Sequence, residues 1–328
     1  GASVIASDYS SNLSVLSNVT GVPLGGNHHA PQEVETEDDV HYVAFVMSDG
    51  DNIQFLQNAF NDPRWWGSQH RGDFPMTWEV SPILPDPAPT ILQWLYESAT
   101  DNDQAVSGPS GAGYALPSLH TDPQGLAEAT GLAMAQTDMR VMTLLNASGG
   151  LEAGDAFTAR PEIDGVIYKD FNDYNALQGA LRWSNGKPIM AFHYLLWDNG
   201  SEADSPMGVA QSINSAPRSP KTDAASYSLV NVHAWSQWPE SPTETGAMGA
   251  TAWTVSLLDS NVRVVSAHEL FKHLSKNLSG QTPPEETVLI LEAETDLSHQ
   301  MGYPDGEGWA CNTTDQTAGH MCYGPYTS

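Results

Sequence analysis

Carboxylates recur at the ends of several apolar runs of this chain, with aromatic residues close to them. The four carboxylates that are candidates for catalysis are Asp51, Glu79, Asp170 and Glu269. Two such groups can hydrolyse a glycosidic bond, because one protonates the leaving oxygen while the other attacks the sugar or activates water. Aromatic rings supply apolar faces against which sugar rings stack. The residue types therefore predict a glycan-directed hydrolase.

Further polar and aromatic residues near the same positions are candidates for substrate binding: Asn52, Tyr114, His193, Trp197, His233 and Trp235. Tyr114 lies in VSGPSGAGYALP, residues 106–117, whose glycines and prolines predict a shaped loop rather than a helix. Glycine lets backbone approach a ligand closely, so we expect Tyr114 to project into a cleft. The alternative is a tight turn in which Tyr114 packs as a plug.

The segment Asp49-Gly50-Asp51-Asn52 has two other interpretations. An aspartate at this position would cap the following helix. The same oxygens would also bind a hard cation, so Asp49 and Asp51 form a weak calcium candidate, although the spacing of an EF-hand loop is missing. No cofactor is required for the predicted hydrolysis. A metal-dependent carbohydrate esterase that uses this segment with a histidine is a further alternative.

Structural interpretations also stay open for the other candidates. Strand alternation would turn Glu79 toward the helices if Trp78 faced inward. Lys169 and Asp170 would form a structural ion pair, and the two strand histidines would be buried and hydrogen bonded. Glu269 would begin the last helix.

Eight apolar runs that resemble strands precede or contain these residues: 41–49, 74–81, 104–110, 140–146, 165–171, 188–197, 227–235 and 262–269. Helical patterns lie at 89–99, 122–136, 174–183, 207–216 and 269–278. Continuous apolar strands that alternate with helices predict an α/β fold with a parallel sheet. Eight strands favour a (β/α)8 TIM-like barrel, whose chemistry sits at the carboxyl ends of the strands. An open doubly wound sheet is the main alternative.

The predicted organisation has four parts: a lead-in segment over 1–40, the barrel domain over 41–279, a linker over 280–287 and a short β segment over 288–328. The last part contains a strand, a turn region rich in aspartate and glycine, and a second strand. It is too short to bury a core of its own.

The charge of the chain excludes some partners. Twelve basic residues face forty acidic ones, for a formal net charge of -28. Nucleic-acid binding needs basic patches, so we expect no nucleic-acid partner. No run approaches the roughly 18 apolar residues of a membrane-spanning helix, so membrane insertion is not expected. Neutral glycans remain as partners, and a solvated acidic surface is the structural interpretation of the charge.

Several features favour an extracellular or cell-surface protein. The chain starts at Gly1 rather than Met, which indicates a processed product. Cys311 and Cys322 lie close together and predict a local disulfide. Asn-x-Ser/Thr sequons predict glycosylation sites at Asn12, Asn18, Asn146, Asn199, Asn277 and Asn312.

Five motifs occur in order: VMSDGDNIQFLQ (46–57), GPSGAGYALPS (108–118), GKPIMAFHYLLWDNG (186–200), SLVNVHAWS (228–236) and NVRVVSAHELFKHL (261–274). Over residues 41–276 the chain resembles the C-terminal domain of the GxGYxYP family, secreted proteins that are classed as glycoside hydrolases by inference. Leu116 stands where the family name has its second tyrosine. The resemblance implies carbohydrate-directed activity and carries over no established catalytic pair, but Asp49, Asp51, Asn52 and Tyr114 match motif positions.

Residues 291–327 resemble the opening of a carbohydrate-binding-module-like β-sandwich. Half a sandwich leaves strand edges unpaired, so we expect residues 288–328 to pack on the barrel or to mediate self-association. A non-catalytic extracellular or cell-surface assembly glycoprotein, built on a glycosidase-like barrel, is therefore the alternative to the enzyme.

Overall fold

The structure is a computed structural model that describes residues 5–7, 11–280, 310–311 and 322–323. The chain divides into two compact units, residues 1–281 and 282–328. In the second unit, β11 (Ala310–Cys311) pairs antiparallel with β12 (Cys322–Tyr323) and sets Cys311 opposite Cys322. The disulfide between them stays a prediction. Most of the predicted β-sandwich segment lies outside the described residues.

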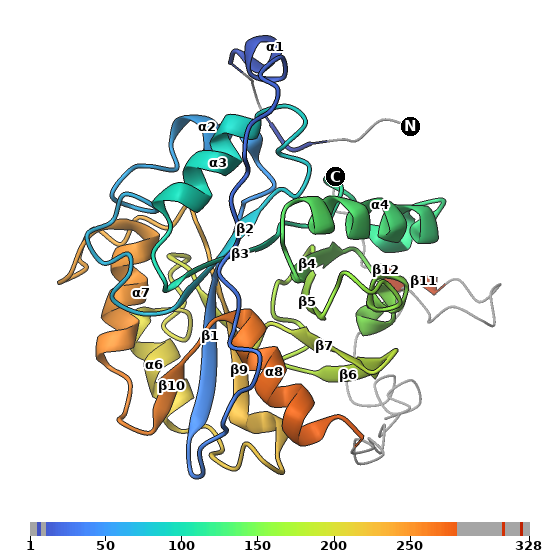
Figure 1. Ribbon diagram of the computed structural model, residues 1–328. Coiled ribbons are helices and arrows are strands. Elements are labelled where there is room, and N and C mark those ends of the chain that lie inside the picture. Colours follow the sequence, from blue (N-terminus) through green and yellow to red (C-terminus); the bar gives the residue numbers. More distant parts are fainter. Residues whose placement is uncertain (1–4, 8–10, 281–309, 312–321, 324–328) are drawn as a thin grey trace. The chain divides into compact units, whose positions relative to one another are not determined.

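The first unit is built on one curled, mostly parallel sheet (Figure 1). Its strands are β1 (His41–Met47), β2 (Met76–Val80), β3 (Asp103–Ser107), β4 (Val141–Asn146), β5 (Gly165–Asp170), β6 (Leu181–Ser184), β7 (Lys187–Ala191), β8 (Tyr194–Leu196), β9 (Tyr227–Val232) and β10 (Val262–Val264). They follow the order β6-β7-β5-β4-β3-β2-β1-β9-β8, and β10 pairs with β1 off this path. Only the β6–β7 pair is antiparallel among these strands.

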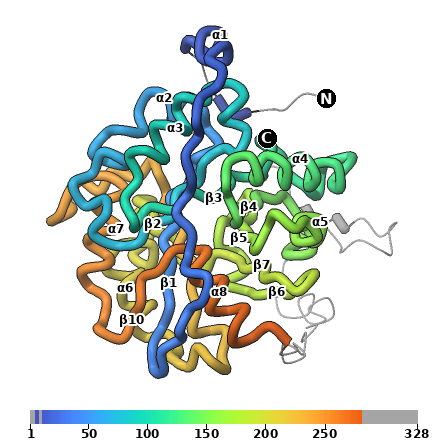
Figure 2. Tube along the Cα trace, viewed as in Figure 1, coloured from blue at the N-terminus to red at the C-terminus, as the bar shows by residue number. Residues whose placement is uncertain are grey.

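Helices connect the strands (Figure 2). The α-helices are α1 (Leu13–Leu16), α2 (Ile53–Asn58), α3 (Pro89–Ser98), α4 (Pro123–Gln136), α5 (Asp155–Thr158), α6 (Pro206–Asn214), α7 (Gly246–Ser256) and α8 (Ala267–Leu278). Short 3-10 turns are η1 (Pro117–Leu119), η2 (Gly150–Gly154) and η3 (Ala224–Ser226). Proline in the first turn of α3, α4 and α6 suits a helix start, since its missing N–H has no partner there.

Strand alternation divides the core between the two faces of the sheet. Phe45 and Met47 of β1 belong to a large cluster on the convex face, which α2, α3, α4, α5, α6 and α7 cover. Tyr42, Ala44 and Val46 of the same strand belong to a second cluster on the concave face. That cluster includes the apolar side of α8, so α8 fills the concave side.

The sheet forms a half-barrel, and the predicted complete (β/α)8 barrel is not confirmed. The eighth predicted strand is reduced to the three residues of β10, which pair only with the beginning of β1, while β9 pairs with β1 along six residues. The following helix, α8, then packs into the concave side instead of outside the sheet. Phe271 of α8 approaches Gly165 at the beginning of β5, where any side chain would collide with its ring.

Besides the shortened eighth strand, two more predicted elements differ in the structure, and most of the others are confirmed. The helix expected over 174–183 is wrong, because turns and the hairpin strand β6 occupy this range. Gln178 and Gly179 both have positive φ there, which ends any helix. The sixth apolar run is interrupted: Phe192 and His193 separate β7, which pairs with β5, from β8, which pairs with β9.

The lead-in segment lies along α8 in its second half, shown in dark blue before β1 (Figure 2). Lys272 of α8 donates to the carbonyl of Pro31 at 2.7 Å, and His273 Nδ1 lies 2.7 Å from the hydroxyl of Thr36. In its first half, Ala6 forms a parallel bridge with Asn52, at the start of α2. Among the described residues, no helix is both long enough and apolar enough to cross a membrane.

Candidate functional site

The loop between β1 and α2 carries the two aspartates of the predicted site. Asp49 has a φ of 68°, a left-handed conformation that is uncommon outside glycine and is often found at functional sites. Its carboxylate accepts hydrogen bonds from the hydroxyl of Ser48 and, at 2.9 Å, from the indole N–H of Trp235. Helix α2 is capped by Asn52, whose side chain accepts from the N–H of Phe55 at 3.1 Å. Neither aspartate is therefore used as the helix cap.

Glycine is required between the two aspartates. A Cβ atom on Gly50 would lie 1.5 Å from the carbonyl oxygen of Glu79, a distance that no side chain can occupy. The β1–α2 loop therefore passes directly over the end of β2. This close approach brings the acidic loop next to the strand that carries Glu79.

Glu79 points into the concave side of the sheet, because its neighbour Trp78 packs on the convex face. Lys169 of β5 points the same way, and its ammonium donates to both carboxylate oxygens of Glu79, at 3.0 and 3.2 Å. Both side chains are almost fully buried. The ion partner of Lys169 is thus Glu79, on a strand three places away in the sheet, rather than its neighbour Asp170.

Three carboxylates and one ammonium share this small region. Burial, together with the negative charges of Glu79 and Asp49, raises the pKa of Asp51 to about 7. Burial likewise raises the pKa of Glu79, against the opposing effect of Lys169. Burial alone would lower the pKa of Lys169, but the surrounding carboxylates outweigh it and the net shift is upward. Asp51 is thereby a carboxylic acid poised to give or take a proton near neutral pH.

The glycine-rich loop after β3 is a rigid structure attached to β4 and α4. The Ser110 hydroxyl bonds both the N–H and the carbonyl of Leu145, at 2.9 and 3.0 Å. Gly111 has a φ of 78° and sits against Thr130, whose hydroxyl accepts from the N–H of Ala112 at 3.1 Å. Tyr114 is 37% exposed, and burial and the charge of Asp51 raise its pKa. The tyrosine is therefore not a buried plug.

Three rings form a continuous stack beside the carboxylates. Tyr174 stacks on Trp197 with centroids 5.9 Å apart, and Trp197 stacks on His233 at 4.3 Å. The Lys169 ammonium lies 5.5 Å from the centroid of Tyr174, which links this stack to the buried ion pair. Burial lowers the pKa of His233, while the charge of Asp49 acts in the opposite direction. The stack ties together the loops that follow β5, β8 and β9.

The structure does not bring three other candidates to this cluster. Asp170 is displaced by alternation, because Lys169 takes the concave position, and its carboxylate accepts from the N–H of Asn172 at 3.0 Å. Glu269 lies in the first turn of α8, with its carboxylate 3.8 Å from His273. His193 stacks on Tyr194 at 4.2 Å, in the break between β7 and β8.

The start of α8, where Glu269 lies, is at the wrong end of the sheet. The N–H of Ala267 donates to Thr77, and that of His268 donates to the side chain of Gln104, both at 3.0 Å. Thr77 and Gln104 stand near the beginnings of β2 and β3, whereas the acidic loop lies where strands end.

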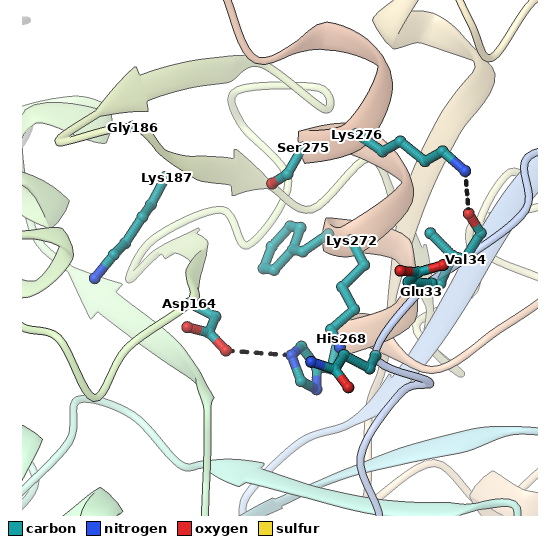
Figure 3. Close-up of a pocket in the computed structure, with 11 residues that line it drawn as sticks. Glu33, Val34, Asp164, Gly186, Lys187, His268, Lys272, Ser275 and Lys276 are labelled. Carbon is teal, nitrogen blue, oxygen red and sulfur yellow. Dashed lines mark hydrogen bonds and ion pairs between the residues drawn. The ribbon is translucent and has the colours of Figure 1, made fainter.

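A cavity of about 550 Å³ opens in the same region of α8 (Figure 3). His268 and Asp164 lie 3.3 Å apart in its wall. Each of its three lysines donates a hydrogen bond to a backbone carbonyl. Lys187 donates to Arg160, Lys272 to Pro31 and Lys276 to Val34. Their ammonium groups do not converge on one point, so we do not assign chemistry to this cavity.

The predicted metal and glycosylation sites stay predictions, and the structure shows the surroundings of most of them. Among the residues that the structure describes, no group of three or more His, Cys, Asp or Glu side chains is arranged to hold a metal ion. At two of the predicted glycosylation sites the side-chain amide forms hydrogen bonds within the protein. Asn146 is buried and bonds Ser118 and Ser148, and Asn277 bonds Thr36. Asn12, Asn18 and Asn199 are exposed. Asn312 lies outside the described residues.

Comparison with known proteins places the chain in a family. The model of the GxGYxYP putative glycoside hydrolase C-terminal domain matches residues 39–275. The chain belongs to this family. Its fold is similar to the solved structure of a putative hydrolase from Bacteroides thetaiotaomicron VPI-5482, at 29% identity and a TM-score of 0.72 over 82% of this chain. The chain spans about half, 51%, of that protein's length. Among curated proteins, none matches it.

Tyr174, Ser48 and Lys169 lie at the site, although none of them is among the site residues that the sequence predicts. Tyr174 falls in the segment that the sequence predicts to be helical, so no strand-end signal marks it. Ser48 directly precedes Asp49 and follows β1, a position that does carry a signal. Its hydroxyl donates to Asp49 and accepts from the N–H of Ala234 at 3.2 Å, which joins the ends of β1 and β9.

Proposed function

We propose that this GxGYxYP domain hydrolyses glycosidic bonds, with Asp51 as the general acid. The observation that carries the proposal is that one loop at the end of β1 places two half-buried carboxyl groups, Asp49 and Asp51, against the end of the strand that carries Glu79. Burial and the charges of Glu79 and Asp49 raise the pKa of Asp51 to about 7. A carboxylic acid with this pKa is protonated in a useful fraction at neutral pH, so it can protonate a leaving glycosidic oxygen. The family description supports the same class of reaction.

Asp49 is the second carboxylate of the proposed pair. Glu79 is unsuited to this role, because it is almost fully buried and both of its oxygens are held by Lys169. Asp49 is half-buried, and its carboxylate is oriented by Ser48 and Trp235. In the proposed reaction Asp51 protonates the leaving oxygen while Asp49 attacks the sugar or activates water. Glu79 and Lys169 lie beneath Asp51, and their charges influence its pKa.

The proposal is tested by the dependence of Asp51→Asn on the leaving group. A general acid matters most when the leaving group is a poor one, because a good leaving group departs without protonation. We expect Asp51→Asn to lower kcat/KM by about 10² to 10⁴ on 4-nitrophenyl glycosides or natural disaccharides. On the matching 2,4-dinitrophenyl glycoside the loss should be much smaller, whereas Asp49→Asn should slow both.

Asp101→Asn is the matched control, since Asp101 is exposed and precedes β3 at the opposite ends of the strands. The assay uses a panel of aryl glycosides that differ in the sugar and its anomeric configuration. Equal losses of Asp51→Asn on both leaving groups, or full activity of this variant on 4-nitrophenyl substrates, would remove Asp51 as the acid. A wild-type chain that cleaves no glycoside of the panel and no disaccharide would count against the function itself.

A further inference from the structure

We propose that Trp235 is the platform on which a sugar ring of the substrate stacks, and that the same indole holds Asp49 in place through its N–H. The inference rests on the proposed glycosidase function and deepens it by naming a substrate class. That class is a glycan of uncharged pyranose rings, which present an apolar face of C–H groups to an aromatic side chain.

The geometry gives Trp235 two separate functions. Its Nε1–H donates to Asp49 at 2.9 Å, so one edge of the indole is fixed on the acidic loop. The ring packs against Phe55 and Trp65, with centroids 4.9 and 5.7 Å away. Despite these contacts, 41% of the residue is exposed. A large aromatic ring that is anchored and exposed at once loses little conformational freedom when a ligand covers it.

The other tryptophans of the region are not suited to this role. The ring of Trp197 already stacks on two neighbouring rings, those of Tyr174 and His233. Trp65 is buried, and its N–H is used by the carbonyl of Ala234. Trp235 is the one tryptophan among the exposed large apolar residues of the described chain, and Tyr114 offers a second partly exposed ring near Asp51.

The charges around Trp235 select against acidic sugars. Asp49, Asp51 and Glu79 face a single ammonium, and the whole chain carries a formal net charge of -28. A uronate or a sulfated sugar would bring another negative charge into this field and would be repelled. A neutral pyranose escapes this penalty and still buries its apolar face against the indole.

Binding is measured by affinity electrophoresis, which needs no turnover. Native gels contain a neutral polysaccharide (laminarin, xyloglucan, galactomannan or soluble starch) or an acidic one (polygalacturonate or heparin). The proteins are the wild type, Trp235→Phe, Trp235→Ala and the control Trp94→Ala, whose side chain lies on α3 and packs near Trp66. Thermal unfolding of each variant verifies that it is folded.

We expect at least one neutral polysaccharide to retard the wild type, Trp235→Phe and Trp94→Ala. Trp235→Ala should bind about tenfold or more weakly, because the stacking surface is lost. The acidic polysaccharides should retard none of the four proteins. On a 4-nitrophenyl glycoside that the wild type cleaves, Trp235→Phe should lower kcat by about tenfold with KM unchanged, because only the hydrogen bond to Asp49 is lost.

The inference is overturned if Trp235→Ala is retarded like the wild type, if no neutral polysaccharide retards the wild type, or if an acidic one does. If Trp235 had only a structural role, Trp235→Phe and Trp235→Ala would have similar thermal unfolding, and Trp235→Phe would not lower kcat at an unchanged KM. Failure here is distinguishable from failure of the proposed function, which depends on the leaving-group response of Asp51→Asn and not on these gels.

Discussion

Replacement of Asp51 by asparagine should stabilise the folded protein, and should do so more at higher pH. The pKa of Asp51 rises from 3.8, its ordinary value, to about 7 in the folded protein. The folded state therefore holds this proton more tightly than the unfolded state does. The resulting stabilisation is fully present below pH 3.8 and is lost as the pH rises through 7, where the folded state must also ionise a half-buried group. Asparagine removes that cost.

The size of the effect follows from the two pKa values. The full shift corresponds to about 4 kcal/mol of free energy of unfolding. Linkage predicts that Asp51→Asn is more stable than the wild type by about 2 kcal/mol at pH 5 and by about 4 kcal/mol at pH 8. The difference in the free energy of unfolding between the two proteins should therefore grow from pH 5 to pH 8.

Urea denaturation of both proteins at several pH values between 5 and 8 measures this difference. Asp101→Asn corrects for the general effect of removing one negative charge from an acidic protein, because Asp101 is exposed. A difference between Asp51→Asn and wild type that stays constant from pH 5 to pH 8, or that shrinks, would refute the reasoning. It would show that Asp51 ionises with an ordinary pKa and cannot be the proposed acid.

Two further predictions concern the buried ion pair of Glu79 and Lys169. In pH profiles of kcat/KM, the activity of the wild type should fall above pH 7 as Asp51 loses its proton. Glu79→Gln should move this fall to a pH about one unit lower, because a negative charge that raises the pKa of Asp51 is gone. An unchanged pH profile would contradict the proposed coupling. Lys169→Met should lower the free energy of unfolding by about 3–5 kcal/mol, because Glu79 would keep a buried charge without a partner, and Glu79→Met in the same chain should restore most of the loss. Urea denaturation measures both variants, and additive losses in the double variant would argue that the two side chains do not act as a pair.

The parts of the fold that depend on local pattern were predictable from the sequence. Apolar runs located most strands, and α3, α4, α6 and α8 follow amphipathic or capped segments. The helix α7 was missed because GAMGATAWTVS is apolar on nearly every side and has no helical stripe to detect. The segment 174–183 contains strong helix formers such as Leu177 and Ala180, but the pairing of β6 with β7 overrides this local preference.

The half-barrel was not predictable because it depends on distant packing. A strand followed by an amphipathic helix has the same local pattern whether the helix packs outside or inside the curled sheet. The inside position requires room, which Gly165 supplies opposite Phe271. No rule of local sequence links these two residues, which are far apart in the chain.

The candidate site was predictable in its chemistry more than in its geometry. Their positions at strand ends identify Asp51 and Glu79 as candidates. Whether the side chain of Glu79 points inward or outward is fixed only by the packing of Trp78. The same strand-end rule also selected Asp170 and Glu269, which the fold keeps apart from the cluster. Alternation could have assigned Asp170 and Lys169 to opposite faces, but it could not say which residue faces the concave side. Partners such as Lys169 and Glu79 come from strands that lie far apart in sequence.

The two aspartates of the proposed site are controlled by different parts of the molecule. The pKa of Asp51 depends first on burial and then on nearby charges, of which the largest is that of Glu79, beneath it in the concave side of the sheet. Asp49 is oriented from above by Trp235, on the loop after β9. Because the sheet interior and this loop are separate structures, their effects should separate in experiment. Glu79→Gln should move the pH profile and leave polysaccharide binding intact, whereas Trp235→Phe should lower kcat and leave the pH of the fall unchanged. A site built as one inseparable network would instead change both properties in both variants.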